Sequence, residues 1–269
     1  ELRADTGETH RSLYRHLPDY PTMKPEITLV IATYNEQQRL QKTYPQIRNY
    51  LKKHYERWEL IIVDDGSTDA TPALLERLKD ADRDIRVIAL THNQGQGAAL
   101  RTGVMAAHGV VIAYTDADLS TPLTHLADLQ DALKRGAHIA IASRWIQGSH
   151  IRHKQPALRR YLGGAFYSLI RLFLPMGIAD VNCGLKAYRD SAAKRIFALT
   201  HSRRWGFNTE HLLIAKRLGY QVTEVPVDWR HHGESKVRLF SDIVYTLWEL
   251  ASIYVRIRRN LRLKRKKPA

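Results

Sequence analysis

Short apolar runs alternate with longer amphipathic stretches through the first half of the chain. The apolar runs are ITLVIAT at 27–33, ELIIVDD at 59–65, IRVIAL at 85–90, GVVIAYTD at 109–116 and HIAIASR at 138–144. Runs rich in Val and Ile, separated by helix-length segments, are typical of βαβ units. The pattern therefore predicts an α/β fold with a mostly parallel central sheet and helices on both faces.

Two of the expected helices have marked starts. Thr71 precedes Pro72 and Thr121 precedes Pro122. Each threonine offers an N-cap hydroxyl, and proline suits the first helical position. Gly136 is expected just past the end of the second of these helices.

Polar residues follow all five predicted strands. They are Thr33, Tyr34, Asn35 and Glu36; Asp64 and Asp65; His92, Asn93 and Gln94; Asp116 and Asp118; Ser143 and Arg144. Any one of these ends is compatible with an ordinary turn, but ligands of open α/β sheets bind beyond the carboxyl ends of the strands. Asp116 and Asp118 are two residues apart, so their carboxylates point to the same side and repel each other unless a cation lies between them.

The charge of the chain is strongly basic and uneven. Lys and Arg number 42 against 27 Asp and Glu, and eight of the last fourteen residues are Arg or Lys. Such a tail binds nucleic acid or anionic lipid head groups, or is simply a solvated end. We expect no nucleic-acid partner, because no binding motif is present and the tail carries no aromatic residue for base stacking. The single cysteine, Cys183, favours a reducing compartment.

Several motifs together resemble a known enzyme family. ATYNE at 32–36, VDDGSTD at 63–69, NQGQGAALRTG at 93–103 and DADLSTP at 116–122 are similar to the signature series of family 2 glycosyltransferases with the GT-A fold. SRW at 143–145, DVNCGLKAY at 180–188, RRWGFNTEHL at 203–212 and GESKV at 233–237 resemble polyprenyl-phosphate sugar transferases, most of all the dolichyl-phosphate β-glucosyltransferase branch and its prokaryotic counterparts.

The resemblance implies a nucleotide-sugar site at the strand ends. UDP-glucose is the expected donor, with GDP-mannose and a UDP-N-acetylhexosamine as alternatives. Asp116 and Asp118 are implied to bind Mg²⁺ or Mn²⁺ against the diphosphate, which agrees with the oxygen ligands these ions prefer. The residues implied to bind the donor are Ala32, Thr33, Tyr34, Glu36, Asp64, Asp65, Gln94, Gly97, Asp116, Asn208 and Glu210. Mannosyl relatives often read D-A-D-x-Q, whereas Ser120 stands here, which favours the glucosyl branch.

The implied acceptor is a polyprenyl phosphate, either dolichyl or undecaprenyl. A phosphate monoester is largely ionised near neutral pH, because its second pKa is about 6, so its attack needs no general base. The candidate phosphate-binding residues are Arg144, Arg204, Ser235 and Lys236, and we expect Arg144 and Lys236 to contribute to catalysis. If the acceptor were a saccharide or protein hydroxyl, a base would be needed, for which Glu210 or Asp180 is a candidate.

A lipid acceptor requires access to a membrane. No run of about 20 uncharged apolar residues exists, so no spanning segment is expected. The stretches 161–177 and 239–258 are compatible with interfacial amphipathic helices, or with packing on the sheet. We expect an N-terminal extension (1–24), a catalytic domain (25–238), an amphipathic interfacial helix (239–258) and a basic tail (259–269). These features predict a peripheral enzyme on the cytoplasmic face of a membrane; a membrane partner protein and a homo-oligomer stay open.

Overall fold

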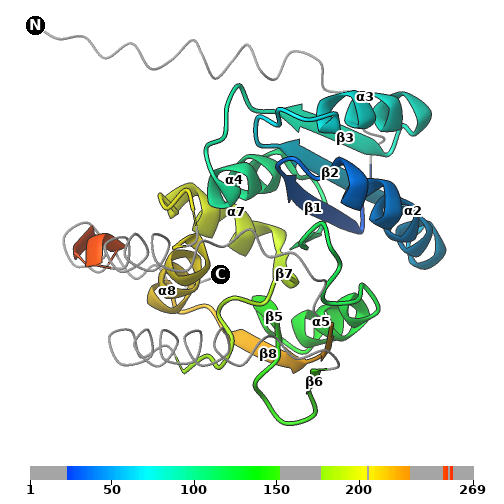
Figure 1. The fold of residues 1–269 in the computed structure, drawn as a ribbon. Helices are drawn as coiled ribbons and strands as arrows, with labels where there is room; N and C mark the ends of the chain where they lie inside the picture. The colour runs from blue at the N-terminus through cyan, green and yellow to red at the C-terminus, as the bar shows by residue number, and fades with distance from the viewer. Residues whose placement is uncertain (1–22, 152–176, 205, 231–250, 254, 257–269) are drawn as a thin grey trace, which may run out of the picture.

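A seven-stranded sheet forms the centre of the computed structural model (Figure 1). The structure describes residues 23–151, 177–204, 206–230, 251–253 and 255–256. The sheet has the order β3-β2-β1-β4-β7-β5-β8, and β7 alone runs antiparallel to its neighbours. Its strands are β1 (Ile27–Thr33), β2 (Trp58–Asp64), β3 (Ile85–Ala89), β4 (Val111–Tyr114), β5 (Ile139–Ser143), β7 (Lys186–Arg189) and β8 (Val222–Pro226). A second, two-stranded sheet pairs β6 (His150–Ile151) with β9 (Asp228–Trp229).

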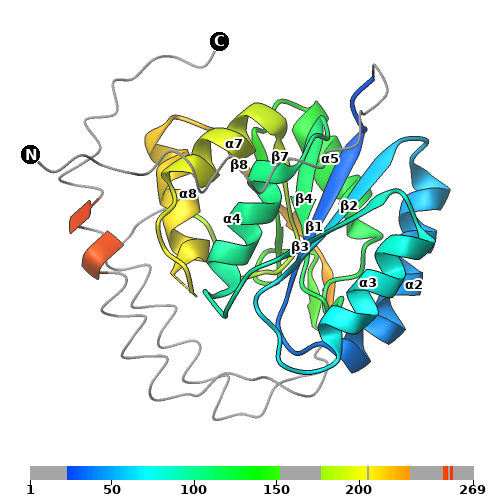
Figure 2. The same ribbon diagram turned by 90° about the horizontal axis from the view of Figure 1, so that it is seen from above.

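Helices cover both faces of the central sheet, as Figure 2 shows from above. One core contains the buried sides of α2 (Gln37–His54), α3 (Thr71–Ala81) and α5 (His125–Lys134), and the other contains those of α4 (Gln96–Ala106), α7 (Asp190–Leu199) and α8 (Phe207–Arg217). Alternate strand residues feed the two cores: Leu29 and Ile31 belong to the first, and Val30 to the second. The predicted α/β class with a mostly parallel sheet is confirmed.

The predicted N-caps of two helices are wrong, although both helices exist. Helix α3 includes Thr71 and has no side-chain cap; the Thr71 hydroxyl instead accepts a hydrogen bond from the Glu36 amide, 3.0 Å away. Helix α5 begins only at His125, and the hydroxyl of Thr121 lies 3.4 Å from the sulfur of Cys183. In both places the threonine hydroxyl contacts a residue distant in sequence instead of capping the helix.

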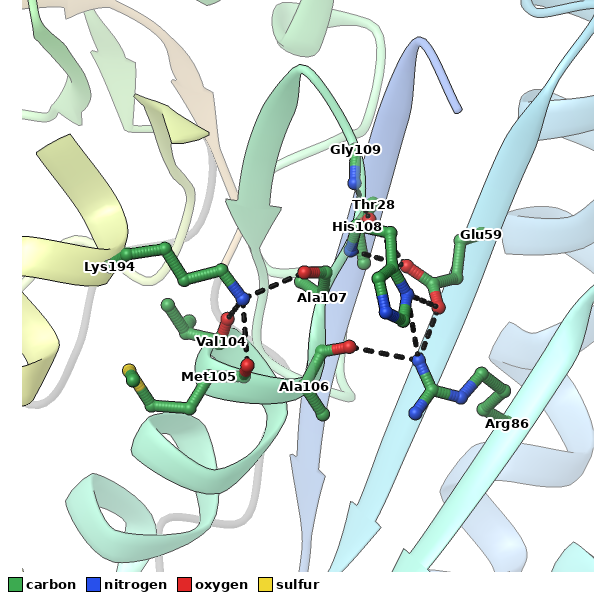
Figure 3. A network of polar contacts seen from close by, with 10 residues as sticks. All are labelled: Thr28, Glu59, Arg86, Val104, Met105, Ala106, Ala107, His108, Gly109 and Lys194. Carbon is green, nitrogen blue, oxygen red and sulfur yellow. Dashed lines mark hydrogen bonds and ion pairs between the residues drawn. The ribbon is translucent and has the colours of Figure 1, made fainter. Parts of the chain in front are cut away.

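A buried polar network joins the amino-terminal ends of the parallel strands (Figure 3). Glu59 at the start of β2 is fully buried, and its carboxylate accepts hydrogen bonds from the Thr28 hydroxyl (2.7 Å), the His108 amide (3.0 Å) and the Arg86 guanidinium (2.5 Å). Arg86 also donates to the carbonyl of Ala106 at the end of α4 (2.9 Å). The network therefore ties three strands to the end of a helix, away from the strand ends where a ligand is expected.

The carbonyl groups that end α4 receive a second cation from another element. The ammonium of Lys194 in α7 donates to the carbonyls of Val104, Met105 and Ala107, each at 2.7 Å (Figure 3). The last carbonyls of a helix have no partner within it. Lys194 and Arg86 therefore satisfy the last carbonyl groups of α4 and link this end of the helix to α7 and β3.

Several predicted segments lie outside the described residues. They include nearly all of the extension 1–24, the stretch 161–177 except Gly177, most of 239–258 and the tail 259–269. The predicted domain boundaries therefore stay predictions. Among the residues that the structure describes, no helix is long and apolar enough to span a bilayer.

Candidate active site

The order of the strands places the predicted site where the sheet changes direction. From β1 the chain continues to β2 and β3 on one side, whereas β4 pairs with the other side of β1. A crevice forms at such a switch point, outside the carboxyl ends of the two central strands. Thr33 at the end of β1, Tyr34 and Glu36 after it, and the acidic pair after β4 therefore lie at this switch point.

The loops that follow β1 and β2 are bonded to each other. Asn35 has a left-handed backbone (φ 54°); its amide donates to the Ser67 hydroxyl (2.9 Å), and its side-chain oxygen accepts from the Thr68 amide (2.8 Å). Ser67 donates both its amide (3.1 Å) and its hydroxyl to the carboxylate of Asp64. These bonds join the two loops into one ordered rim at the carboxyl ends of β1 and β2.

Asp65 holds the loop that leads into α4. Its two carboxylate oxygens accept the amides of Gln94 and Gly95, both at 2.8 Å. Burial raises the pKa of Asp65, although these two bonds oppose the shift. Asp65 thus positions Gln94 and the first turn of α4, which contains the buried Gly97.

Asp116 and Asp118 lie together just beyond β4. One oxygen of Asp116 accepts a hydrogen bond from the side-chain amide of Gln96 (2.9 Å), and Asp118 accepts the Ser120 amide (2.8 Å). Burial and the charge of Asp118 raise the pKa of Asp116 to about 6. The charge of Asp118 therefore acts on Asp116, although residues 117 and 118 form a turn rather than the extended segment that the prediction assumed.

The acidic pair fits a divalent cation. Within the described ranges no group of three or more His, Cys, Asp or Glu side chains is placed to hold a metal ion. Among the described residues, Asp116 and Asp118 would supply carboxylate ligands, and phosphate oxygens and water would fill the remaining coordination positions of the ion. That division is common for Mg²⁺, which keeps several waters and binds through one or two carboxylates together with substrate phosphates.

Lys186 is a site residue that the sequence analysis missed. Its ammonium is fully buried, donates to the side-chain oxygen of Asn208 (2.8 Å) and lies 5.3 Å from the ring centroid of Tyr114. Burial lowers its pKa to about 8, while the charge of Asp116 acts in the opposite direction. The first residue of β7 reaches this edge because β7 is antiparallel and pairs Lys186 with Tyr114. A lysine within the otherwise apolar CGLKAY was the available signal.

Arg144 is bound to a buried carboxylate beside the acidic pair. Its guanidinium donates twice to Asp180 (2.6 and 2.9 Å), and its backbone amide donates to the same side chain (3.0 Å). Burial alone lowers the pKa of Arg144, but the charge of Asp180 outweighs burial and raises it. Glu224 in turn accepts the amides of Ala179 and Asp180 (2.7 and 2.9 Å). Arg144 is therefore a fixed cation, and its charge also lowers the pKa of Asp116.

Glu210 organises the loop before α8. One oxygen accepts the amides of His201 (2.9 Å) and Ser202 (2.6 Å), and the other lies 3.2 Å from the guanidinium of Arg256. Arg204 belongs to this loop and is exposed. Both carboxylates considered as a general base, Glu210 and Asp180, thus bind other groups of the protein.

The structure brings four of the predicted residues together around Lys186. Asp116, Asp118 and Arg144 share one electrostatic environment, and Asn208 joins it through Lys186. Asp64, Asp65 and Glu210 instead make bonds that hold loops in place. Ser235 and Lys236 lie outside the described residues. All of these assignments to substrate stay predictions.

Known proteins resemble this chain over most of its length. A family model described as glycosyl transferase family 2 matches residues 28–197. The dolichyl-phosphate beta-glucosyltransferase of Mus musculus is 35% identical over 237 residues, covering 81% of this chain and 71% of that protein. The enzyme of the same name from Drosophila melanogaster is 32% identical over 257 residues, covering 89% of this chain and 77% of that protein.

Solved structures share the fold at lower sequence identity. Glucosyl-3-phosphoglycerate synthase from Mycobacterium tuberculosis, in complex with Mn²⁺, UDP and glucosyl-3-phosphoglycerate, has a TM-score of 0.65 at 18% identity and covers 88% of this chain and 85% of its own. A mannosyltransferase from Pyrobaculum calidifontis, in complex with GDP-Man and Mn²⁺, has a TM-score of 0.57 at 19% identity and covers 93% of this chain and 70% of its own.

Proposed function

Since this chain belongs to glycosyltransferase family 2 and is a glycosyltransferase, we propose that it transfers glucose from UDP-glucose to a polyprenyl phosphate such as dolichyl phosphate. The observation that carries the proposal is the acidic pair Asp116 and Asp118 at the switch point, with the cations Lys186 and Arg144 in the same electrostatic environment. The relatives named dolichyl-phosphate beta-glucosyltransferase support the choice of sugar and acceptor.

The donor diphosphate would lie against the acidic pair. Mg²⁺ or Mn²⁺ held by Asp116 and Asp118 would neutralise the negative charge that develops on the leaving diphosphate. Two structural neighbours, bound to nucleotides and Mn²⁺, support a divalent ion in this fold. The chain itself orders the rim of the nucleoside pocket through Asn35, Asp64 and Asp65, so that little reorganisation accompanies binding.

The acceptor phosphate would meet Arg144 and, in the part of the chain not described, Lys236. The Arg144 guanidinium keeps its charge at every accessible pH, because Asp180 raises its pKa. The phosphate oxygen would attack the anomeric carbon in line with the departing diphosphate, which inverts the configuration. The bonds that already occupy Asp180 and Glu210 favour an acceptor that needs no base over a hydroxyl acceptor.

A lipid acceptor would be met at a membrane surface. The net charge of +15 and the basic tail after residue 258 favour contact with anionic head groups. We place the enzyme peripherally on the cytoplasmic face.

The test is a product assay on the purified chain. Protein with Mg²⁺ or Mn²⁺ is incubated with a short polyprenyl phosphate and UDP-glucose, GDP-mannose or a UDP-N-acetylhexosamine, and the lipid is identified by mass spectrometry. We expect a hexosyl polyprenyl phosphate from UDP-glucose. The matched control is the polyprenol without phosphate; a product from the alcohol alone would favour the hydroxyl acceptor. No product from any donor, together with salt-dependent DNA binding, would overturn the proposal.

A further inference from the structure

The backbone of Gly184 lies against the carboxylate of Asp116. A Cβ atom added to Gly184 would lie 2.0 Å from one oxygen of Asp116 and 2.6 Å from its carboxyl carbon. Non-bonded atoms do not approach so closely, so any side chain at position 184 must displace its neighbour. The backbone of Gly184 does not have the left-handed conformation that favours glycine. Space for the carboxylate is therefore the reason for glycine at this position.

The other side of the same carboxylate is held by Gln96. The Gln96 amide donates to the oxygen of Asp116 opposite the one that faces Gly184. Gln96 is the first residue of α4, and Gly184 lies shortly before β7. The Asp116 carboxylate thus lies between two segments that are distant in sequence: Gln96 donates a hydrogen bond to it, and the backbone of Gly184 packs against it.

Building on the metal role proposed above, we propose that Gly184 and Gln96 are positioning residues for the metal site, because together they set the place and rotation of the Asp116 carboxylate. Neither residue touches the reacting atoms. Gly184 acts by leaving room for the carboxylate, and Gln96 by fixing which oxygen stays available to a cation. Mutation of a group that orients a metal ligand typically costs about 10- to 100-fold in metal affinity or activity.

A methyl group at position 184 should affect metal binding more than folding. The atoms it meets form the end of a side chain, which can rotate away at little cost to the fold but then leaves the metal site. Gly109 offers the matched contrast. A Cβ there would meet the backbone nitrogen of Thr28 at 2.4 Å and the carbonyl carbon of Ile27 at 2.7 Å, and backbone cannot rotate away.

The experiment compares Gly184→Ala, Gln96→Leu and the control Gly109→Ala with the unaltered chain. Binding of Mn²⁺ in the presence of UDP is followed by loss of the electron paramagnetic resonance signal of free Mn²⁺, and folding is followed by thermal unfolding. We expect Gly184→Ala and Gln96→Leu to weaken Mn²⁺ binding by about 10- to 100-fold, with small changes in melting temperature. Gly109→Ala should lower the melting temperature while its folded fraction binds Mn²⁺ normally.

The outcomes separate this inference from the proposed function. Asp118→Ala serves as the reference for the metal site itself. If Asp118→Ala loses Mn²⁺ while Gly184→Ala and Gln96→Leu bind it normally, the positioning inference is wrong and the metal site stands. If Asp118→Ala binds Mn²⁺ like the unaltered chain, the metal assignment itself fails. If Gly184→Ala does not fold, Gln96→Leu decides the question, and normal Mn²⁺ binding by that variant overturns the inference.

Discussion

Replacement of Arg86 by methionine should destabilise the fold without altering the chemistry of the enzyme. Arg86 forms an ion pair with the buried carboxylate of Glu59, whereas His108 contributes a positive charge there only when it is protonated. Methionine keeps much of the apolar stem but removes the guanidinium. The fully buried Glu59 would then keep its charge with weaker compensation, and the Ala106 carbonyl would lose its donor.

The expected size of the effect follows from the bonds that remain. Breaking a buried ion pair by removing one partner typically costs about 3–5 kcal/mol. One oxygen of Glu59 keeps both its donors, the Thr28 hydroxyl and the His108 amide, so we expect the lower end, about 3 kcal/mol. For a chain of this size that loss corresponds to a decrease in melting temperature of about 6–12 °C.

Urea unfolding followed by tryptophan fluorescence measures the loss, with Arg77→Met as the control. Arg77 is exposed on α3 and donates to the Ala73 carbonyl of its own helix (3.3 Å), so its replacement should change stability little. Steady-state kinetics of the folded Arg86→Met protein should match the unaltered enzyme, because Arg86 lies at the amino-terminal edge of the sheet. A change in unfolding free energy below about 1 kcal/mol, the scale of one ordinary hydrogen bond, would refute the reasoning.

The pH dependence gives an independent check on the same network. Burial alone would raise the pKa of Glu59, but the hydrogen bonds from Thr28 and Arg86 outweigh it and lower the pKa below the ordinary 4.5. The folded state therefore binds fewer protons than the unfolded state in acid, and this stabilisation is present above pH 4.5 and lost as the pH falls through the folded-state pKa. The difference in unfolding free energy between the unaltered protein and Arg86→Met should therefore decrease as the pH falls through that range.

Three further predictions concern the site and its surroundings. Burial lowers the pKa of Lys186 from 10.5 to about 8, so between these pH values the unfolded state binds more protons and the unfolding free energy should rise with pH. Transfer activity should fall over the same range, because the ammonium loses its charge. Parallel titrations of Lys186→Met should show neither pH dependence. Lys236→Ala should raise the KM for the polyprenyl phosphate more than that for the nucleotide sugar, and the reverse in initial-rate kinetics would remove Lys236 from the acceptor site. Deletion of residues 259–269 should weaken sedimentation with anionic liposomes but not with neutral ones; equal binding to both by the full chain would show that the tail has no electrostatic role.

The periodicity of the sequence determined the fold class because it reflects burial directly. Runs such as ITLVIAT are apolar at consecutive positions, as expected of a strand whose two faces are both covered by helices. Strands β1, β2, β4 and β5 were therefore predictable. The motifs at their ends indicated the family, which the family match confirms. The spacing of Asp116 and Asp118 indicated mutual repulsion; burial first and the charge of Asp118 second raise the pKa of Asp116.

Tertiary structure alone decided which groups surround that pair. Lys186 reaches the site because β7 is inserted antiparallel between β4 and β5, and no local pattern specifies the place of a strand in a sheet. Gly184 and Gln96 contact Asp116 from segments that are distant in sequence, and the hydroxyls of Thr71 and Thr121 contact partners distant in sequence rather than capping helices. Burial is encoded residue by residue and is legible in a single chain, whereas the partner of a polar group depends on long-range packing that brings distant segments together.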